Sequence, residues 1–174
     1  MSLSCRLMNA SSLAGLGVVL MALAAPVGAH GPSHHGRSEA ARTGGATAPE
    51  QKPWGVVGTA SAARRSIEIS MSDDMRFQPA HLEVRLGETV RLVIRNRGAL
   101  MHELVIGTRD ELDSHAALML KHPNMEHDEP WMAHVEPGRS GDLIWTFNRA
   151  GEFEFACLLP GHFQAGMRGT IRVR

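Results

Sequence analysis

The sequence contains little cysteine, no net charge and no apolar run long enough to span a membrane. Two of its 174 residues are cysteines, and its 18 basic residues balance its 18 acidic residues. Nucleic-acid binding needs clustered positive charge, so this balance argues against a nucleic-acid partner. The apolar run from Leu13 to Ala25 is shorter than a membrane-spanning helix requires, and stable membrane insertion of the mature chain is not expected.

This apolar run instead has the features of a secretory signal. Arg6 precedes it, and Val27-Gly28-Ala29 follows it as a small-residue cleavage pattern. The sequence therefore predicts a signal peptide over residues 1–29, removed after Ala29, and an exported protein. Cleavage removes Cys5 and leaves Cys157 without a disulfide partner in the chain. Such a thiol is either buried and inert or bound by a metal.

The residues that follow Cys157 favour the metal. Cys157, His162 and Met167 stand in the pattern Cys-x4-His-x4-Met, which combines a thiolate, an imidazole and a thioether in one short segment. A His2Cys set with a weak axial Met is the ligand set of a type 1 copper centre. His102 is the leading candidate for the second histidine. Ordinary core packing is the alternative for His102 or Met167 taken alone.

Residues 30–63 are rich in Gly, Ala, Ser, Thr and Pro and have little periodic apolar content. This composition predicts a flexible tail, because it buries too little surface to offset the entropy of ordering. The tail opens with His30, His34 and His35, which are suited to loose binding of copper or zinc. Incidental histidines in a solvated segment are the alternative.

From Ser66 onward, apolar residues alternate with polar ones at period two. Short strands at this spacing, broken by Gly and Pro, predict an antiparallel sandwich or barrel over residues 64–174. The expected inward residues are Ile67, Ile69 and Met71; Leu82, Val84 and Leu86; Val90, Leu92 and Ile94; His102, Leu104 and Ile106; Leu143, Trp145 and Phe147; Phe153, Phe155 and Cys157; and Ile171 and Val173.

One helix interrupts this pattern. Thr108 and Glu111 have the spacing of a capping box, and Pro123 is expected to stop the helix just after His122. The residues expected on its buried face are Leu112, Ala116, Met119 and Leu120.

The strand pattern also predicts how the copper ligands meet. Cys157 and His102 both belong to inward sets, so they can point to the same end of the sandwich. The loop after Cys157 then carries His162 and Met167 over that end. Gly166 is expected to let the backbone approach closely beside Met167.

The region from about Ser66 to Arg174 resembles the cupredoxins, the plastocyanin and azurin superfamily. Three stretches resemble more narrowly the periplasmic copper-tolerance cupredoxins of proteobacteria: Met101-His102-Glu103, Met125 to Pro130, and Cys157 to Phe163. The resemblance implies an all-β, Greek-key β-sandwich with one inserted helix, located in the periplasm. It also implies copper as the cofactor. By this resemblance the equatorial ligands are His102, Cys157 and His162, and the axial ligand is Met167.

A second group of Met and His residues lies between the helix and the next strands. Its best candidates for accessory copper binding are Met125, His127, Met132 and His134. Thioethers suit Cu(I) and imidazoles suit either oxidation state, so a second site or an entry path is chemically reasonable. The neighbouring Asp128 and Glu129 favour the alternative, a solvated loop.

Three functions compete at this point. Copper tolerance, through copper binding and one-electron chemistry, fits the extra His and Met residues. A soluble electron carrier would instead dock on a redox partner through an apolar rim around His162, made of Leu158, Leu159, Pro160, Phe163 and Ala165. A domain that acts with a copper oxidase or reductase is disfavoured, because Ala156 and Leu158 flank Cys157 where those proteins carry histidines. No enzymatic turnover is therefore expected from this chain alone. The protein is also expected to be a monomer.

Overall fold

The structure is a computed structural model that describes residues 48–123, 125 and 127–174. The predicted signal peptide and the tail histidines His30, His34 and His35 lie outside the described residues. Within the described part of the chain, no helix is long and apolar enough to cross a membrane.

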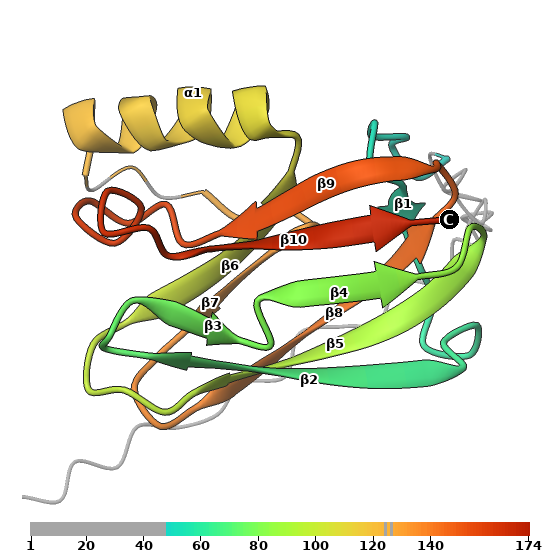
Figure 1. Cartoon of the computed structure of the whole chain (residues 1–174), viewed down its shortest axis with the longest axis horizontal. Coiled ribbons are helices and arrows are strands. Elements are labelled where there is room, and N and C mark those ends of the chain that lie inside the picture. The colour runs from blue at the N-terminus through green and yellow to red at the C-terminus, as the bar shows by residue number, and fades with distance from the viewer. Residues whose placement is uncertain (1–47, 124, 126) are drawn as a thin grey trace, which may run out of the picture. The chain divides into compact units, whose positions relative to one another are not determined.

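Two five-stranded sheets form a β-sandwich (Figure 1). The first sheet has the order β1 (Val56–Val57), β8 (Ser140–Phe147), β5 (Glu88–Asn96), β2 (Arg65–Ser72) and β3 (Arg76–Gln78). The second has the order β4 (His81–Val84), β10 (Arg168–Val173), β9 (Gly151–Ala156), β6 (His102–Gly107) and β7 (Met132–Val135). The all-β sandwich predicted from the sequence is confirmed.

The alternation pattern predicted antiparallel sheets, but each sheet contains one parallel pair of strands. β2 pairs with β5 in parallel, and β4 pairs with β10 in parallel. The chain crosses to the second sheet at β4 before β5 returns beside β2, so these neighbours are not joined by a hairpin. Only a direct hairpin forces adjacent strands to be antiparallel.

The main core lies between the two sheets and follows the predicted alternation. In β5 the predicted inward residues Val90, Leu92 and Ile94 are fully buried, whereas Arg91 and Arg95 are exposed. One predicted inward residue is wrong. Leu86 is 54% exposed because β4 ends at Val84, which leaves Leu86 in the turn that leads to β5.

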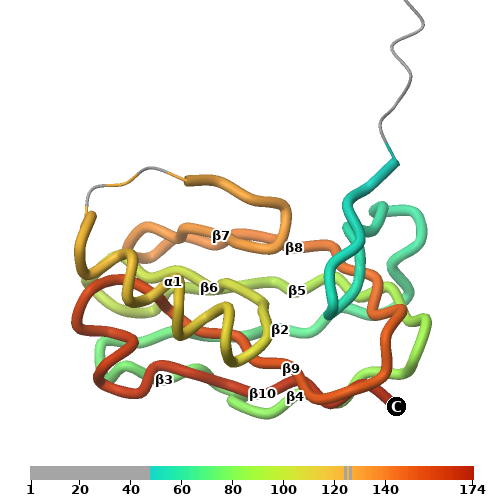
Figure 2. The backbone as a smooth tube through the Cα atoms, turned by 90° about the horizontal axis from the view of Figure 1, so that it is seen from above, coloured from blue at the N-terminus to red at the C-terminus, as the bar shows by residue number. Residues whose placement is uncertain are grey.

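Helix α1 (Arg109–Lys121) covers β9 and β6 (Figure 2). Its capping box is present, with the Glu111 N–H donating to the Thr108 side chain and Glu111 accepting from the Thr108 N–H. Leu112, Ala116 and Met119 are buried in a small second core beneath the helix, as predicted. Leu120 is 54% exposed, which corrects the predicted helix face. At 3.6 residues per turn, Leu120 lies about 80° around the helix from Leu112.

The folded domain begins earlier than the predicted boundary at residue 64. Trp54 is 3% exposed and belongs to the main core, and β1 pairs with β8. The Trp145 indole Nε1–H donates to the Trp54 carbonyl at 3.1 Å, and the Trp54 and Trp131 rings meet edge to face. Residues 48–63 are therefore part of the sandwich. Their composition is poor in apolar residues, but one buried tryptophan contributes a large apolar area.

Candidate metal centre

Three donor side chains converge at one end of the sandwich. His102 is the first residue of β6, Cys157 directly follows β9, and His162 lies in the loop between β9 and β10. One donor atom from each lies within 4.8 Å of the other two. Cys157 Sγ and His162 Nδ1 are 3.4 Å apart. His102 and Cys157 are fully buried, whereas His162 is partly exposed.

Strand pairing explains this convergence. β6 and β9 are antiparallel neighbours with Val105 opposite Ala156, so the residues that follow β9, beginning with Cys157, continue beside the first half of β6. Alternation then turns His102 and Cys157 toward the main core, as the sequence predicted. The scaffold therefore fixes two of the three donors through regular strands.

Backbone hydrogen bonds close the loop that carries the third donor. The His162 N–H donates to the Leu159 carbonyl, the Met167 N–H to the His162 carbonyl, and the Cys157 N–H to the Met167 carbonyl. Met167 itself is fully buried in the main core. Gly166 has φ of +86°, and a Cβ there would meet no atom nearer than 4.0 Å. Glycine is therefore needed for its left-handed backbone and not for the predicted close approach.

His102 is oriented by Asp73, which lies in the turn after β2. The Nε2–H of His102 donates to Asp73 Oδ1 at 3.0 Å, and the N–H groups of Ala99 and Leu100 donate to the same carboxylate. The Ala99 N–H first, and His102 second, hold the pKa of Asp73 below its usual value. This contact assigns the ring proton to Nε2 and leaves Nδ1 as an acceptor.

The second ring nitrogen of His102, Nδ1, shows whether the site suits a metal ion. Nδ1 is buried and has no hydrogen-bond partner among the described residues. A buried polar atom without a partner costs about 1–3 kcal/mol, and a metal ion at the convergence of the three donors would remove that cost. The residues present therefore fit a metal ion.

The buried thiol supports the same conclusion. Burial raises the pKa of Cys157 to about 12, so the thiol stays protonated unless a cation stabilises the thiolate. Two imidazoles and a thiolate, with a buried Met167 on the same loop, form a donor set suited to copper. The arrangement can hold a copper ion away from water at the end of a rigid sandwich.

Sequence reasoning missed two acidic residues beside this centre, Asp73 and Glu103. Glu103 directly follows His102, is fully buried, and accepts the Leu158 N–H at 2.7 Å through Oε1. A carboxylate directly before the apolar run Leu104-Val105-Ile106 of a predicted strand is a usable sequence signal. Asp73 gives no comparable signal, because carboxylates are common in turns.

The accessory copper candidates separate in the structure. His127 and His134 meet Glu103, with one donor atom from each within 4.8 Å of the other two. Met125 contributes a backbone contact, since its carbonyl lies 3.0 Å from His127 Nδ1. Met132 is 4% exposed and packs in the small core beneath α1.

The predicted apolar rim around His162 is smaller than expected. Leu158 is fully buried and Phe163 is 7% exposed, because both pack in the small core beneath α1. Leu159 is half-buried, and Pro160 and Ala165 are exposed. Two residues before His102 add exposed apolar surface, Leu100 at 47% and Met101 at 37%.

Comparisons with known proteins agree with this geometry. The family model described as copper binding proteins, plastocyanin/azurin family, matches residues 64–174. The copper-resistant cuproprotein CopI of Rubrivivax gelatinosus is 50% identical over 122 residues, which cover 70% of this chain and 74% of that protein. The protein of the same name from Pseudomonas aeruginosa is 37% identical over 150 residues, covering 70% and 82% of the two chains.

Solved structures support the fold. Auracyanin B superposes with a TM-score of 0.58 at 22% identity, covering 69% of this chain and 94% of that one. The dithionite-reduced auracyanin of Roseiflexus castenholzii gives a TM-score of 0.56 at 23% identity, covering 64% and 98%. Both show the same kind of sandwich.

Proposed function

Because the chain belongs to the plastocyanin/azurin family of copper-binding proteins, we propose that it is a periplasmic type 1 copper protein that contributes to copper tolerance. The observation that carries the proposal is the convergence of His102, Cys157 and His162, with a buried nitrogen on His102 that has no hydrogen-bond partner in the part of the chain that the structure describes. The copper-resistant cuproproteins among its relatives support the physiological role.

Each ligand has a distinct place in the proposed site. His102 Nδ1, Cys157 Sγ and His162 Nδ1 would hold the copper ion, with the thioether of Met167 as a weaker fourth donor. Bound copper supplies a one-electron Cu(II)/Cu(I) couple. The chain supplies a fixed frame through the strand ends, the Asp73 contact and the closed loop, so the donors rearrange little when the oxidation state changes.

The location of the protein is part of the proposal. The predicted signal peptide over residues 1–29 supports export to the periplasm. Copper that enters the periplasm would then have access to this site. Binding at the site would lower the concentration of free copper.

A soluble electron carrier is the second candidate. His162 is the ligand that reaches the surface, and exposed apolar groups at Pro160, Leu100 and Met101 surround this region of the chain. Such a surface suits a weak, transient partner. Catalysis by this chain alone is not proposed, because Ala156 and Leu158 beside Cys157 are apolar and offer no side-chain donor.

Growth and respiration of a deletion strain separate the two candidates. We expect the strain to grow poorly in high copper and to respire normally. Restoring the gene should rescue growth, whereas Cys157→Ser and His162→Ala should not. His81→Ala is the matched control, since it removes another exposed imidazole. Normal growth in high copper with impaired respiration would overturn the tolerance role in favour of the carrier.

A further inference from the structure

A second set of donor groups lies on the other face of β6 from His102. Side chains alternate along a strand, so His102 and Glu103 point to opposite faces of the sheet. Leu104 and Ile106 pack in the main core with the His102 side, whereas Val105 packs in the small core beneath α1. Glu103 therefore faces the side of the sheet that α1 covers.

Glu103 and His134 are directly opposite each other on β6 and β7. His134 Nε2 lies 2.9 Å from Glu103 Oε2, within ion-pair distance, and this carboxylate raises the pKa of His134. The two atoms lack the alignment of a full hydrogen bond, and Oε2 has no aligned hydrogen-bond donor among the described residues. Glu103 is fully buried. A buried carboxylate is costly unless it is paired or binds a metal. This oxygen is therefore an incompletely satisfied anion directed at two imidazoles.

His127 has the hydrogen-bond pattern of a metal ligand. Its Nδ1 lies 3.0 Å from the Met125 carbonyl, which can only accept, so Nδ1 carries the ring proton. The lone pair is then on Nε2, which is buried and has no hydrogen-bond partner among the described residues. Metal-binding histidines commonly donate their other N–H to a carbonyl in this way, which fixes the tautomer.

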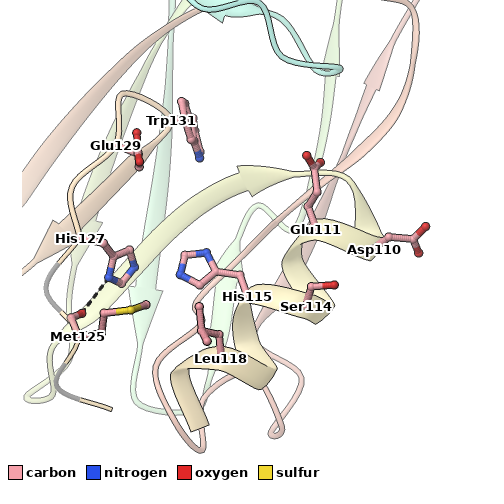
Figure 3. Close-up of a pocket in the computed structure, with 9 residues that line it drawn as sticks. All are labelled: Asp110, Glu111, Ser114, His115, Leu118, Met125, His127, Glu129 and Trp131. Atoms are coloured by element: carbon pink, nitrogen blue, oxygen red, sulfur yellow. Dashed lines mark hydrogen bonds between the residues drawn. The ribbon is translucent and has the colours of Figure 1, made fainter. Parts of the chain in front are cut away.

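A third imidazole lies beside this pair. Figure 3 shows His115 projecting from α1 toward His127, and the two ring centroids are 4.7 Å apart. The His127 and His134 centroids are 5.4 Å apart. The rings of His115, His127 and His134 therefore neighbour one another in turn, and His134 at the end of this row contacts Glu103.

We propose that Glu103, His127 and His134 bind a second Cu(II) ion, with His115 positioned as a further donor. One donor atom from each of the first three residues lies within 4.8 Å of the other two, a spacing that one ion can bridge. Two imidazoles and a carboxylate suit divalent copper or zinc. Cu(II) binds such a set more tightly than Zn(II) in the usual order of affinities, and the protein is proposed to meet excess copper.

A surface hollow gives this second site an approach. Met101, Met119, Met125, His127 and His134 all line it, together with Pro123 and Leu159. Met101 and Met125 are 37% and 36% exposed. Thioethers are soft donors that bind Cu(II) only weakly, so the hollow offers transient contacts to a Cu(II) ion without competing with the imidazoles and the carboxylate.

The second site is connected to the first through two peptide units. Glu103 directly follows His102, and its Oε1 accepts the N–H of Leu158, which directly follows Cys157. A cation on Oε2 would withdraw charge from Oε1 and weaken this hydrogen bond. Filling the second site should therefore shift the thiolate-to-copper absorption of the first. The second site rests on its own donors and does not depend on the proposed type 1 site.

Copper titration of the mature chain tests the proposal. We expect two Cu(II) ions per chain and two paramagnetic signals, one from the thiolate site and one from a site with nitrogen and oxygen donors. His127→Ala and His134→Ala should remove the second signal, or lower its affinity by about tenfold or more, while the thiolate absorption remains. His122→Ala is the matched control, because it removes an exposed imidazole at the end of α1.

Two further variants make the outcome unambiguous. Cys157→Ser should abolish the thiolate absorption and retain the second signal, which separates failure of one site from failure of the other. Replacing His30, His34 and His35 together with Ala should leave the second signal intact. The proposal is overturned if His127→Ala and His134→Ala leave the second signal unchanged, if the tail variant removes it, or if a single copper binds per chain. Circular dichroism of each variant checks that it is folded.

Discussion

At the scale of single residues, the candidate copper site depends on a carboxylate that is not itself a ligand. Asp73 holds the Nε2–H of His102 and is held in turn by the N–H groups of Ala99 and Leu100. Gly98 leaves room for it, since a Cβ at that position would lie 1.9 Å from Asp73 Oδ1. This network sets both the tautomer and the orientation of His102.

The variant Asp73→Asn tests the network. The amide oxygen can still accept from His102, but the negative charge is lost and one backbone N–H loses its acceptor. We expect Cu(II) affinity to fall about 10- to 100-fold in a chelator competition titration, with the thiolate absorption still formed. Asp74→Asn makes the same charge change in the same turn without touching His102 and should have little effect. Equal affinities for the two variants would contradict this role.

At the scale of elements, the sequence predicted what depends on local spacing. The capping box of α1 and the buried faces of β5 and β6 follow from helix and strand periodicity, and the structure confirms them. Leu120 was placed wrongly because four apolar residues near one helix face cannot all fit a narrow stripe. The grouping of Glu103 with His127 and His134 was missed because these residues, on β6, on β7 and on the segment before β7, come together only through tertiary packing.

Substitutions in α1 separate its two apolar faces. Leu112→Ala should lower the free energy of unfolding by about 2–5 kcal/mol, because Leu112 is 2% exposed and its loss leaves a cavity beneath the helix. Leu120→Ala should change it by less than about 0.5 kcal/mol, since this side chain is on the surface. Denaturant-induced unfolding of the two variants measures the difference. Similar losses for both would show that the helix packs on a different face.

At the scale of the whole molecule, the sandwich is closed by a segment that composition alone assigned to a tail. The Trp54 ring packs against Trp131, and its carbonyl accepts a hydrogen bond from the Trp145 indole, 91 residues later in the sequence. Neither a single tryptophan in a polar segment nor the parallel pairing of β2 with β5 can be read from local periodicity. Both depend on where distant parts of the chain meet.

Removing the Trp54 side chain tests this contribution. Trp54→Ala should destabilise the domain by about 3–5 kcal/mol, because a fully packed aromatic ring is lost from the core. Val57→Ala, at a 38% exposed position in β1, is the control and should cost much less. Thermal and denaturant unfolding of both variants give the comparison. A stability unchanged by Trp54→Ala would mean that residues 48–63 do not support the fold.

The central claim is that Cys157 is the thiolate of a type 1 copper site. Its most direct test is the visible absorption and paramagnetic spectrum of the mature protein loaded with Cu(II), beside that of Cys157→Ser. The structure predicts an intense thiolate-to-copper absorption that disappears in Cys157→Ser, even where the variant still binds copper elsewhere. Absence of this absorption in the native chain, or its survival in Cys157→Ser, would contradict the claim.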